Sequence, residues 1–397
     1  MAISVGIGLS TDKDHLQAAK EAIRQARARL AKDKIDLALV FSSVEFAHPA
    51  VIKAIHSALG EIPVLGSTSL AVITNEGIFK HGLAVVLFNL PKGVTFSAAL
   101  VKEIRAKTLP ASGEELAVKL LRDIKDTYRD FALIFCDGLI RDASGLITGL
   151  QERLGKSFPL VGGLASDDLS FKRTYLYFNQ GIFTDAAAGV LWAGRLHFGS
   201  GVKHGWRPLG KPRHITRSRE NIVQEIDGQP AVKVYEEYFA ETIEQLRKDL
   251  KRISVFYPLG IYLAGEKEYL LRNILSIEDD GSLAFQGDVA QGSLVRLMIG
   301  TKESCLEATY QAVQDVKRSL GNKKISLALV FDSASRYILL GRQAGRELDI
   351  IRQGLGEDTP VIGIYTYGEE APLRELYYLG KTYFHNQTIT ILGIADQ

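Results

Sequence analysis

Residues Ile35–Ser42, with the sequence IDLALVFS, form a nearly unbroken apolar run that is typical of a β-strand buried on both faces. The helical pattern of Pro49–Leu59 follows, and the short apolar run Ile62–Gly66 then ends on a glycine. Together these segments predict a strand–helix–strand unit, the element from which parallel and mixed α/β sheets are built.

The same pattern returns twice, in residues 131–163 and 325–363. Aligning each strand-end phenylalanine with the next strand's proline gives separations of 22, 24 and 29, for Phe41 and Pro63, Phe135 and Pro159, and Phe331 and Pro360. The third copy therefore carries a helix about one turn longer than the others. Because the copies lie at irregular positions, they do not indicate a solenoid of fixed short period.

The intervening segments alternate apolar and polar residues around glycine turns, which predicts antiparallel strand meanders near residues 175–198 and 259–299. Helices are expected at Gln229–Asp249 and Thr301–Leu320. The expected fold class is therefore α/β, with two packed domains of mixed β-sheets. We place the domain boundary near Asn221–Gly228, which divides the chain into residues 1–224 and 225–397.

Composition excludes several classes of protein. The 397 residues include 48 Lys and Arg against 46 Asp and Glu, and this balance argues against a nucleic-acid binder. Two cysteines without a CxxC pair argue against a disulfide framework and a thiolate metal site. Neither a signal peptide nor an apolar run of about 18 residues is found, so we expect a cytoplasmic protein without membrane insertion.

The common catalytic motifs are also missing from the sequence. It contains no dinucleotide fingerprint, no phosphate loop, no GxSxG elbow and no HExxH motif. An enzyme is therefore not the leading expectation, and the sequence predicts no catalytic residue.

The most distinctive segment is Gly201–Tyr235, which contains Gly205-Trp206, Pro208-Leu209-Gly210, Ile226-Asp227-Gly228 and Pro230-Ala231. It resembles the junction of the two FIST domains, the N-terminal and C-terminal parts of a bacterial sensory module. Two further segments fit the resemblance, VGGLASD at 161–167 and GIYTYGE at 363–369 together with FHNQT at 384–388. The correspondence covers roughly residues 30 to 393.

This resemblance implies a cytoplasmic small-ligand sensor that takes part in signal transduction, with amino acids among the ligands. It also implies output through a separate signalling protein, such as a histidine kinase or a cyclic-di-GMP enzyme. Some family members work as haem-bound nitric-oxide sensors, which makes haem the alternative to a sensor without a cofactor. Where many members carry a cysteine, this chain has Ala334, which puts any cysteine-based redox or metal role in doubt.

The candidate ligand-binding residues follow the second strand of two units, because ligands in α/β sheets bind at the carboxyl ends of strands. Gly162 and Gly163 allow close approach of a ligand to the backbone, and Asp167 or Asp168 can take an ammonium group. The alternative is that the glycines turn the chain and an aspartate caps the turn.

The third unit offers Tyr365, Thr366, Tyr367 and Glu369 at the corresponding place, with Arg336 beyond the neighbouring strand. Arg336 for a carboxylate and Glu369 or Asp167 for an amine would form an amino-acid site. The alternatives are an Arg336–Glu369 salt bridge that closes the loop, an enzyme that uses Asp167, Glu369 and Tyr365, or a scaffold without a ligand.

Histidines supply the remaining candidates. His385 and Asn386 lie in a short strand pattern near the end of the chain, where hydrogen-bonded structure is the alternative to ligand contact. His204, beside Trp206, is the candidate axial ligand of the haem alternative.

Overall fold

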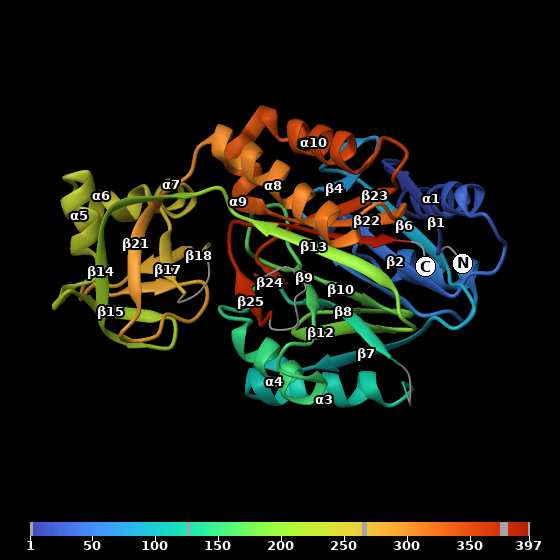
Figure 1. The fold of residues 1–397 in the computed structure, drawn as a ribbon, viewed down its shortest axis with the longest axis horizontal. Helices are drawn as coiled ribbons and strands as arrows, with labels where there is room; N and C mark the ends of the chain where they lie inside the picture. The colour runs from blue at the N-terminus through green and yellow to red at the C-terminus, as the bar shows by residue number, and fades with distance from the viewer. Residues whose placement is uncertain (1–2, 125–127, 264–267, 374–379, 396–397) are drawn as a thin grey trace.

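Three copies of one α/β unit form the larger of two lobes in the computed structural model, which describes residues 3–124, 128–263, 268–373 and 380–395 (Figure 1). In each copy, four strands form a sheet with the same order of pairing, β1-β6-β2-β3, β7-β12-β8-β9 and β13-β26-β22-β23. Each copy contains one parallel pair, β2 with β3, β8 with β9 and β22 with β23. These pairs are the strands that the sequence pattern predicts. The α/β fold with mixed sheets is thus confirmed.

The elements of the first copy are β1 (Ser4–Ser10), α1 (His15–Arg29), β2 (Leu37–Ser42), η1 (Val44–Phe46), α2 (Pro49–Leu59), β3 (Val64–Thr68) and β6 (Leu83–Asn89). Those of the second are β7 (Thr95–Lys102), η2 (Ile104–Ala106), α3 (Leu109–Leu121), β8 (Arg129–Cys136), α4 (Ser144–Leu154), β9 (Leu160–Leu164) and β12 (Ala186–Ala193). Those of the third are β13 (His197–Lys203), α8 (Lys302–Leu320), β22 (Ile325–Ser333), α9 (Ala334–Leu340), η3 (Gly341–Gln343), α10 (Gly345–Leu355), β23 (Val361–Thr366) and β26 (Ile389–Ala395).

Each copy also gives a hairpin to the sheet of another copy. The hairpin of β4 (Val72–Thr74) and β5 (Gly77–Phe79) joins the third sheet, and that of β10 (Leu176–Phe178) and β11 (Gly181–Phe183) joins the first. The hairpin of β24 (Glu369–Pro372) and β25 (Thr382–His385) joins the second. This cyclic exchange ties the three units into one body.

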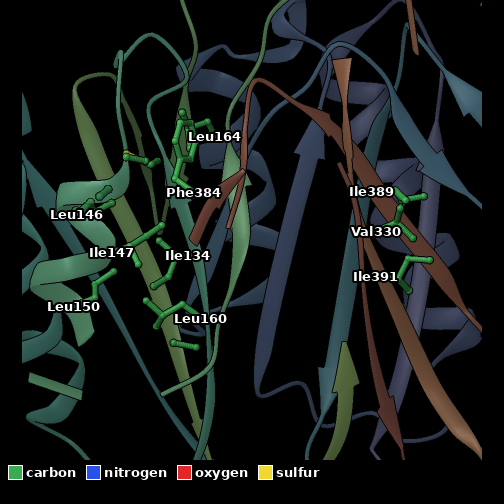
Figure 2. Close-up of a cluster of buried hydrophobic side chains, with 14 of the residues drawn as sticks. Ile134, Leu146, Ile147, Leu150, Leu160, Leu164, Val330, Phe384, Ile389 and Ile391 are labelled. Atoms are coloured by element: carbon green, nitrogen blue, oxygen red, sulfur yellow. The ribbon is translucent and has the colours of Figure 1, made fainter. Parts of the chain in front are cut away.

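The three sheets share a central core at the strand-end phenylalanines. Phe135 lies 5.7 Å from Phe41 and 6.1 Å from Phe331 between ring centroids, so one ring from each unit meets in the same place. The opposite faces of the sheets are covered by helices. Figure 2 shows Ile134 and Leu160 packed against Ile147 of α4 in that second layer of the core.

A glycine at the same register position explains how closely the parallel strands approach in each copy. Gly66 lies opposite Val40, and a Cβ there would lie 1.7 Å from the Val40 carbonyl oxygen. Gly162 stands in the same relation to Ile134, at 1.9 Å. The glycine that ends each apolar run is therefore required by packing.

Residues 207–299 form the smaller lobe, which is inserted between β13 and α8 and lies to the left in Figure 1. Its helices are α5 (Lys233–Phe239), α6 (Ile243–Lys248) and α7 (Leu250–Phe256). Its strands are β14 (Arg207–Arg219), β15 (Ile222–Ile226), β16 (Gln229–Pro230), β17 (Leu259–Tyr262), β18 (Tyr269–Arg272), β19 (Ile274–Ile277), β20 (Leu283–Phe285) and β21 (Leu294–Ile299). The expected boundary between residues 224 and 225 lies within β15.

Two of the expected helices have different outcomes. The helix expected at Thr301–Leu320 is α8, whose capping residue Thr301 accepts a hydrogen bond from the Ser304 amide. The helix expected at Gln229–Asp249 is wrong as one element. Ala240, in a left-handed conformation with φ 54°, ends α5, and Thr242 begins α6 with a capping box.

The two lobes are held together by a buried apolar cluster, in which Leu271 and Met298 of the smaller lobe pack with Leu339 of the larger, and by polar contacts at the side of β25. Arg272 donates to the Phe384 carbonyl oxygen at 3.0 Å, and the Asn273 amide donates to Asn386 at 3.1 Å. Gln387 donates to the Ser254 carbonyl oxygen at 2.7 Å. Within the described part of the chain, no helix has the length and apolar character needed to span a membrane.

Candidate functional site

Arg336 is the centre of a buried ionic cluster in the third unit. Asp332, at the end of β22, accepts from its Nε at 2.9 Å, and Glu347 of α10 accepts from its Nη2. The remaining donors go to the His204 carbonyl oxygen at 2.6 Å and to the Cys305 carbonyl oxygen and Thr309 hydroxyl of α8. The side chain is 0% exposed. Arg336 is therefore committed to internal acceptors, and its expected role as a ligand carboxylate's partner is corrected.

The cluster holds one cation against two nearby carboxyl groups. Burial raises the pKa of Asp332 well above its ordinary value, and the charge of Glu347 raises it further, while Arg336 opposes both effects. A protonated Asp332 leaves one full ion pair, which is the arrangement that a low-dielectric interior tolerates.

Glu369 belongs to a neighbouring network and does not pair with Arg336. Its carboxylate accepts from the hydroxyls of Thr366 at 2.6 Å and Thr388 at 2.8 Å. Burial raises the pKa of Glu369 to about 7, although these hydrogen bonds lower it. The alternative of an Arg336–Glu369 salt bridge is therefore also wrong, because each side chain has other partners.

Asp167 organises the loop that follows β9. It accepts from the amides of Lys172 at 2.8 Å and Phe171 at 3.1 Å and from the hydroxyl of Tyr367. Burial raises its pKa, but the hydrogen bonds outweigh that effect and the net shift is downward. This is the capping arrangement that the sequence left as the alternative. Asp167 itself is buried, whereas the neighbouring Asp168 is exposed to solvent.

The other predicted residues are also inside the protein. Gly162 and Gly163 pair with Glu370 and Glu369 of β24, and the Tyr365 side chain is fully buried. His385 lies 2.9 Å from the Ala371 carbonyl oxygen, and burial lowers its pKa to about 4. These contacts fit a structural role in joining the units.

Sequence reasoning missed Glu370, which follows Glu369 in β24. Its side chain is 0% exposed, and neither carboxylate oxygen has a hydrogen-bond partner among the described residues. Burial raises the pKa of Glu370 to about 8. Successive side chains of a strand point to opposite faces, so in a strand buried on both faces Glu369 and Glu370 are both buried. Two adjacent glutamates in such a strand were the sequence signal for this buried carboxyl group.

An open cavity is found where the lobes meet, and we call it the interlobe cavity. It has a volume of about 150 Å³ and is lined in part by Lys203, His204 and Gln311 of the larger lobe and by Arg207 and Glu268 of the smaller lobe. His204 is the predicted site residue that this cavity contains. The cavity lies directly beside the Arg336 cluster, because the His204 carbonyl oxygen accepts from Arg336.

The interlobe cavity carries charges of both signs. Glu268 lies 3.1 Å from Nε2 of His204 and 3.3 Å from Nζ of Lys203. Burial lowers the pKa of His204 to about 4, with Glu268 opposing and Arg336 and Lys203 adding to the effect. His204 is therefore neutral at physiological pH, and its Nδ1 accepts from the Trp206 amide at 2.9 Å.

These contacts do not fit a haem at His204. Nε2, the nitrogen that would face the iron, faces the carboxylate of Glu268. The cavity is smaller than the roughly 300–1,000 Å³ of drug-sized ligand sites, and its lining places the charged Lys203, Arg207 and Glu307 beside Trp206.

Comparison with known proteins supports the resemblance. The FIST N domain matches residues 36–229, and the FIST C domain matches residues 231–372. An uncharacterized protein of Methanocaldococcus jannaschii is 25% identical over 244 residues, 57% of this chain and 46% of that protein, so the chain spans about half the length of that relative. An uncharacterized protein of Mycobacterium tuberculosis is 23% identical over 99% of this chain and 100% of that protein. A solved cyanuric acid hydrolase from A. caulinodans covers all of both chains at 9% identity with a TM-score of 0.39, too weak a likeness to bear on fold or activity.

Proposed function

The chain belongs to the FIST family, whose domains are associated with sensory signal transduction, and we propose that it senses a small zwitterion, such as an amino acid, bound in the interlobe cavity. The observation that carries the proposal is the composition of this cavity. Cationic and anionic side chains from both lobes face one space of about 150 Å³.

Charge complementarity favours a zwitterion over a simple anion or cation. Among the described residues, Arg207 has no ion pair, so its guanidinium is available to hold a carboxylate in a two-pronged contact. Glu268 and Glu307 supply acceptors for an ammonium group. The small volume favours a ligand of amino-acid size.

A bound ligand would act on the relative position of the lobes. Arg207 and Glu268 belong to the smaller lobe, whereas Lys203 and Gln311 belong to the larger one, so a ligand that contacts both sets favours one arrangement. The change would reach the larger lobe's interior through His204, whose carbonyl oxygen accepts from Arg336 at 2.6 Å. Binding transmits a signal only through such a difference in affinity between two arrangements.

Output through a separate signalling protein, such as a histidine kinase or a cyclic-di-GMP enzyme, remains part of the proposal. The larger lobe's Arg336 cluster connects the cavity with α8, α9 and α10, because its acceptors lie on or beside these helices. A partner that contacts these helices would detect the change.

A thermal-shift screen of the twenty amino acids tests the proposal. A ligand at 100 times its Kd stabilises the protein by about 2.7 kcal/mol, which raises Tm measurably. We expect at least one amino acid to raise Tm in the natural chain but not in Arg207→Gln or Glu268→Gln. Arg219→Gln, at the far end of β14, is the matched control and keeps the response. The proposal is wrong if no amino acid raises Tm or if all variants respond alike.

A further inference from the structure

A larger cavity, which we call the basal cavity, lies at the amino-terminal ends of β22 and β23, the parallel strands of the third unit. It has a volume of about 580 Å³, and its walls include Ile325 and Pro360 at the start of β22 and β23 and Gly321 at the end of α8. This volume lies within the range of small-molecule sites. None of the candidate ligand-binding residues predicted from the sequence lines this cavity, and it is distinct from the interlobe cavity.

Three lysines give the basal cavity a positive charge. Lys317, Lys323 and Lys324 line it, and none of them has an ion pair within the described ranges of the chain. The cavity also contains two carboxylates, but Glu357 is paired with Arg352 at 2.6 Å. The uncompensated charges are therefore three cations and the carboxylate of Asp358. A group with more than one negative charge, such as a phosphate, suits this balance.

The rest of the lining combines apolar residues, the hydroxyl-bearing Ser4 and Thr359, and the carboxylate of Asp358. Ile3, Val5, Ile325 and Leu355 are the larger apolar residues of the lining, and Ile3 and Leu355 are at most 9% exposed. Asp358 adds a carboxylate that can accept from neighbouring hydroxyl groups. A ligand with a phosphate, a hydroxylated sugar and a flat apolar ring has one part for each kind of surface.

We propose that the basal cavity binds a nucleoside phosphate, with its phosphate groups at Lys317, Lys323 and Lys324. Asp358 accepts from the ribose hydroxyls, and the aliphatic side chains contact the base. The basal cavity is separate from the interlobe cavity but shares helix α8 with it, since Ser304 and Gln311 line one and Lys317 lines the other.

The experiment titrates ADP into the full chain by calorimetry and compares it with adenosine and inorganic pyrophosphate. We expect ADP to bind and adenosine to bind at least about tenfold more weakly. Pyrophosphate should compete with ADP, because it occupies the lysines without using the aliphatic wall. Adenosine that binds as tightly as ADP, or ADP that does not bind at about millimolar concentration, overturns the proposal.

A charge-matched pair of variants locates the site. Lys317→Gln/Lys323→Gln/Lys324→Gln should weaken ADP binding at least about tenfold. The control replaces three exposed lysines of the smaller lobe, Lys211→Gln/Lys248→Gln/Lys251→Gln, and should leave the affinity unchanged. Equal affinities of the two triple variants would place the binding elsewhere and refute the assignment. Glu268→Gln should bind ADP normally, which distinguishes this site from the interlobe cavity.

Discussion

The substitution Glu370→Gln tests the buried electrostatics of the larger lobe directly. Glu370 is fully buried in β24, and its carboxylate oxygens have no hydrogen-bond partner in the described structure. Burial raises its pKa from 4.5 to about 8, because the charged form loses its hydration. At neutral pH the native protein therefore keeps a proton on Glu370 that the unfolded chain releases.

The sign and size of the effect follow from this difference. Between pH 4.5 and about 8, the native state binds one more proton than the unfolded state, so the free energy of unfolding falls as pH rises. The slope is about 1.4 kcal/mol per pH unit for one group, which gives a total on the order of 4–5 kcal/mol across the window. Glu370→Gln removes this dependence, because the amide does not titrate.

The assay is urea unfolding of the natural chain and of Glu370→Gln at several pH values between about 5 and 9. The difference between the two proteins isolates Glu370, since all other titrating groups are common to both. Relative to the natural chain, the variant should gain stability steadily up to about pH 8 and then level off. Glu61→Gln is the control, because Glu61 is exposed, and its difference should stay constant. A difference between Glu370→Gln and the natural chain that does not change with pH would show that burial does not raise the pKa of Glu370.

Three further substitutions test the core. Arg336→Met should lower the free energy of unfolding by about 3–5 kcal/mol, because two buried carboxyl groups lose their cation, and a loss below about 1 kcal/mol in urea would contradict the cluster. Phe135→Ala should cost about 3–5 kcal/mol by calorimetry, whereas Phe171→Ala, at a ring that is 57% exposed, should cost less than about 1, and equal losses would argue against the shared core. Gly162→Ala places a Cβ 1.9 Å from a carbonyl oxygen and should lower stability by about 3 kcal/mol or more, so an unchanged Tm would show that the strands can separate.

The repeated units could be predicted from the sequence because each carries its own local pattern. The buried strands, the intervening helix and the terminal glycine all lie within about 30 to 40 residues, and Phe41, Phe135 and Phe331 align in the structure as they do in the sequence. The exchange of hairpins could not be predicted in this way. The pairing of β4 with β23 joins residues about 290 positions apart, and no local pattern encodes such a partner.

The candidate site was less predictable, because partners decide what a polar side chain does. Asp167 and Arg336 were correctly located at strand ends, but their hydrogen bonds come from a loop and from helices that the sequence did not place there. The interlobe cavity depends on Arg207 and Glu268, which are separated by about 60 residues and meet only through the smaller lobe's fold. The sequence singled out His204 beside Trp206, but in the structure both ring nitrogens face polar groups, the carboxylate of Glu268 and the Trp206 amide.

Energy transfer between dyes on the two lobes measures whether a ligand in the interlobe cavity changes their relative position. Both native cysteines, Cys136 and Cys305, are buried, so dyes can be attached to Lys248→Cys in the smaller lobe and Lys53→Cys in the larger. We predict that an amino acid selected by the thermal-shift screen changes the transfer efficiency, and that Arg207→Gln abolishes the change. A ligand that binds by calorimetry while the transfer efficiency stays constant would show that binding does not move the lobes.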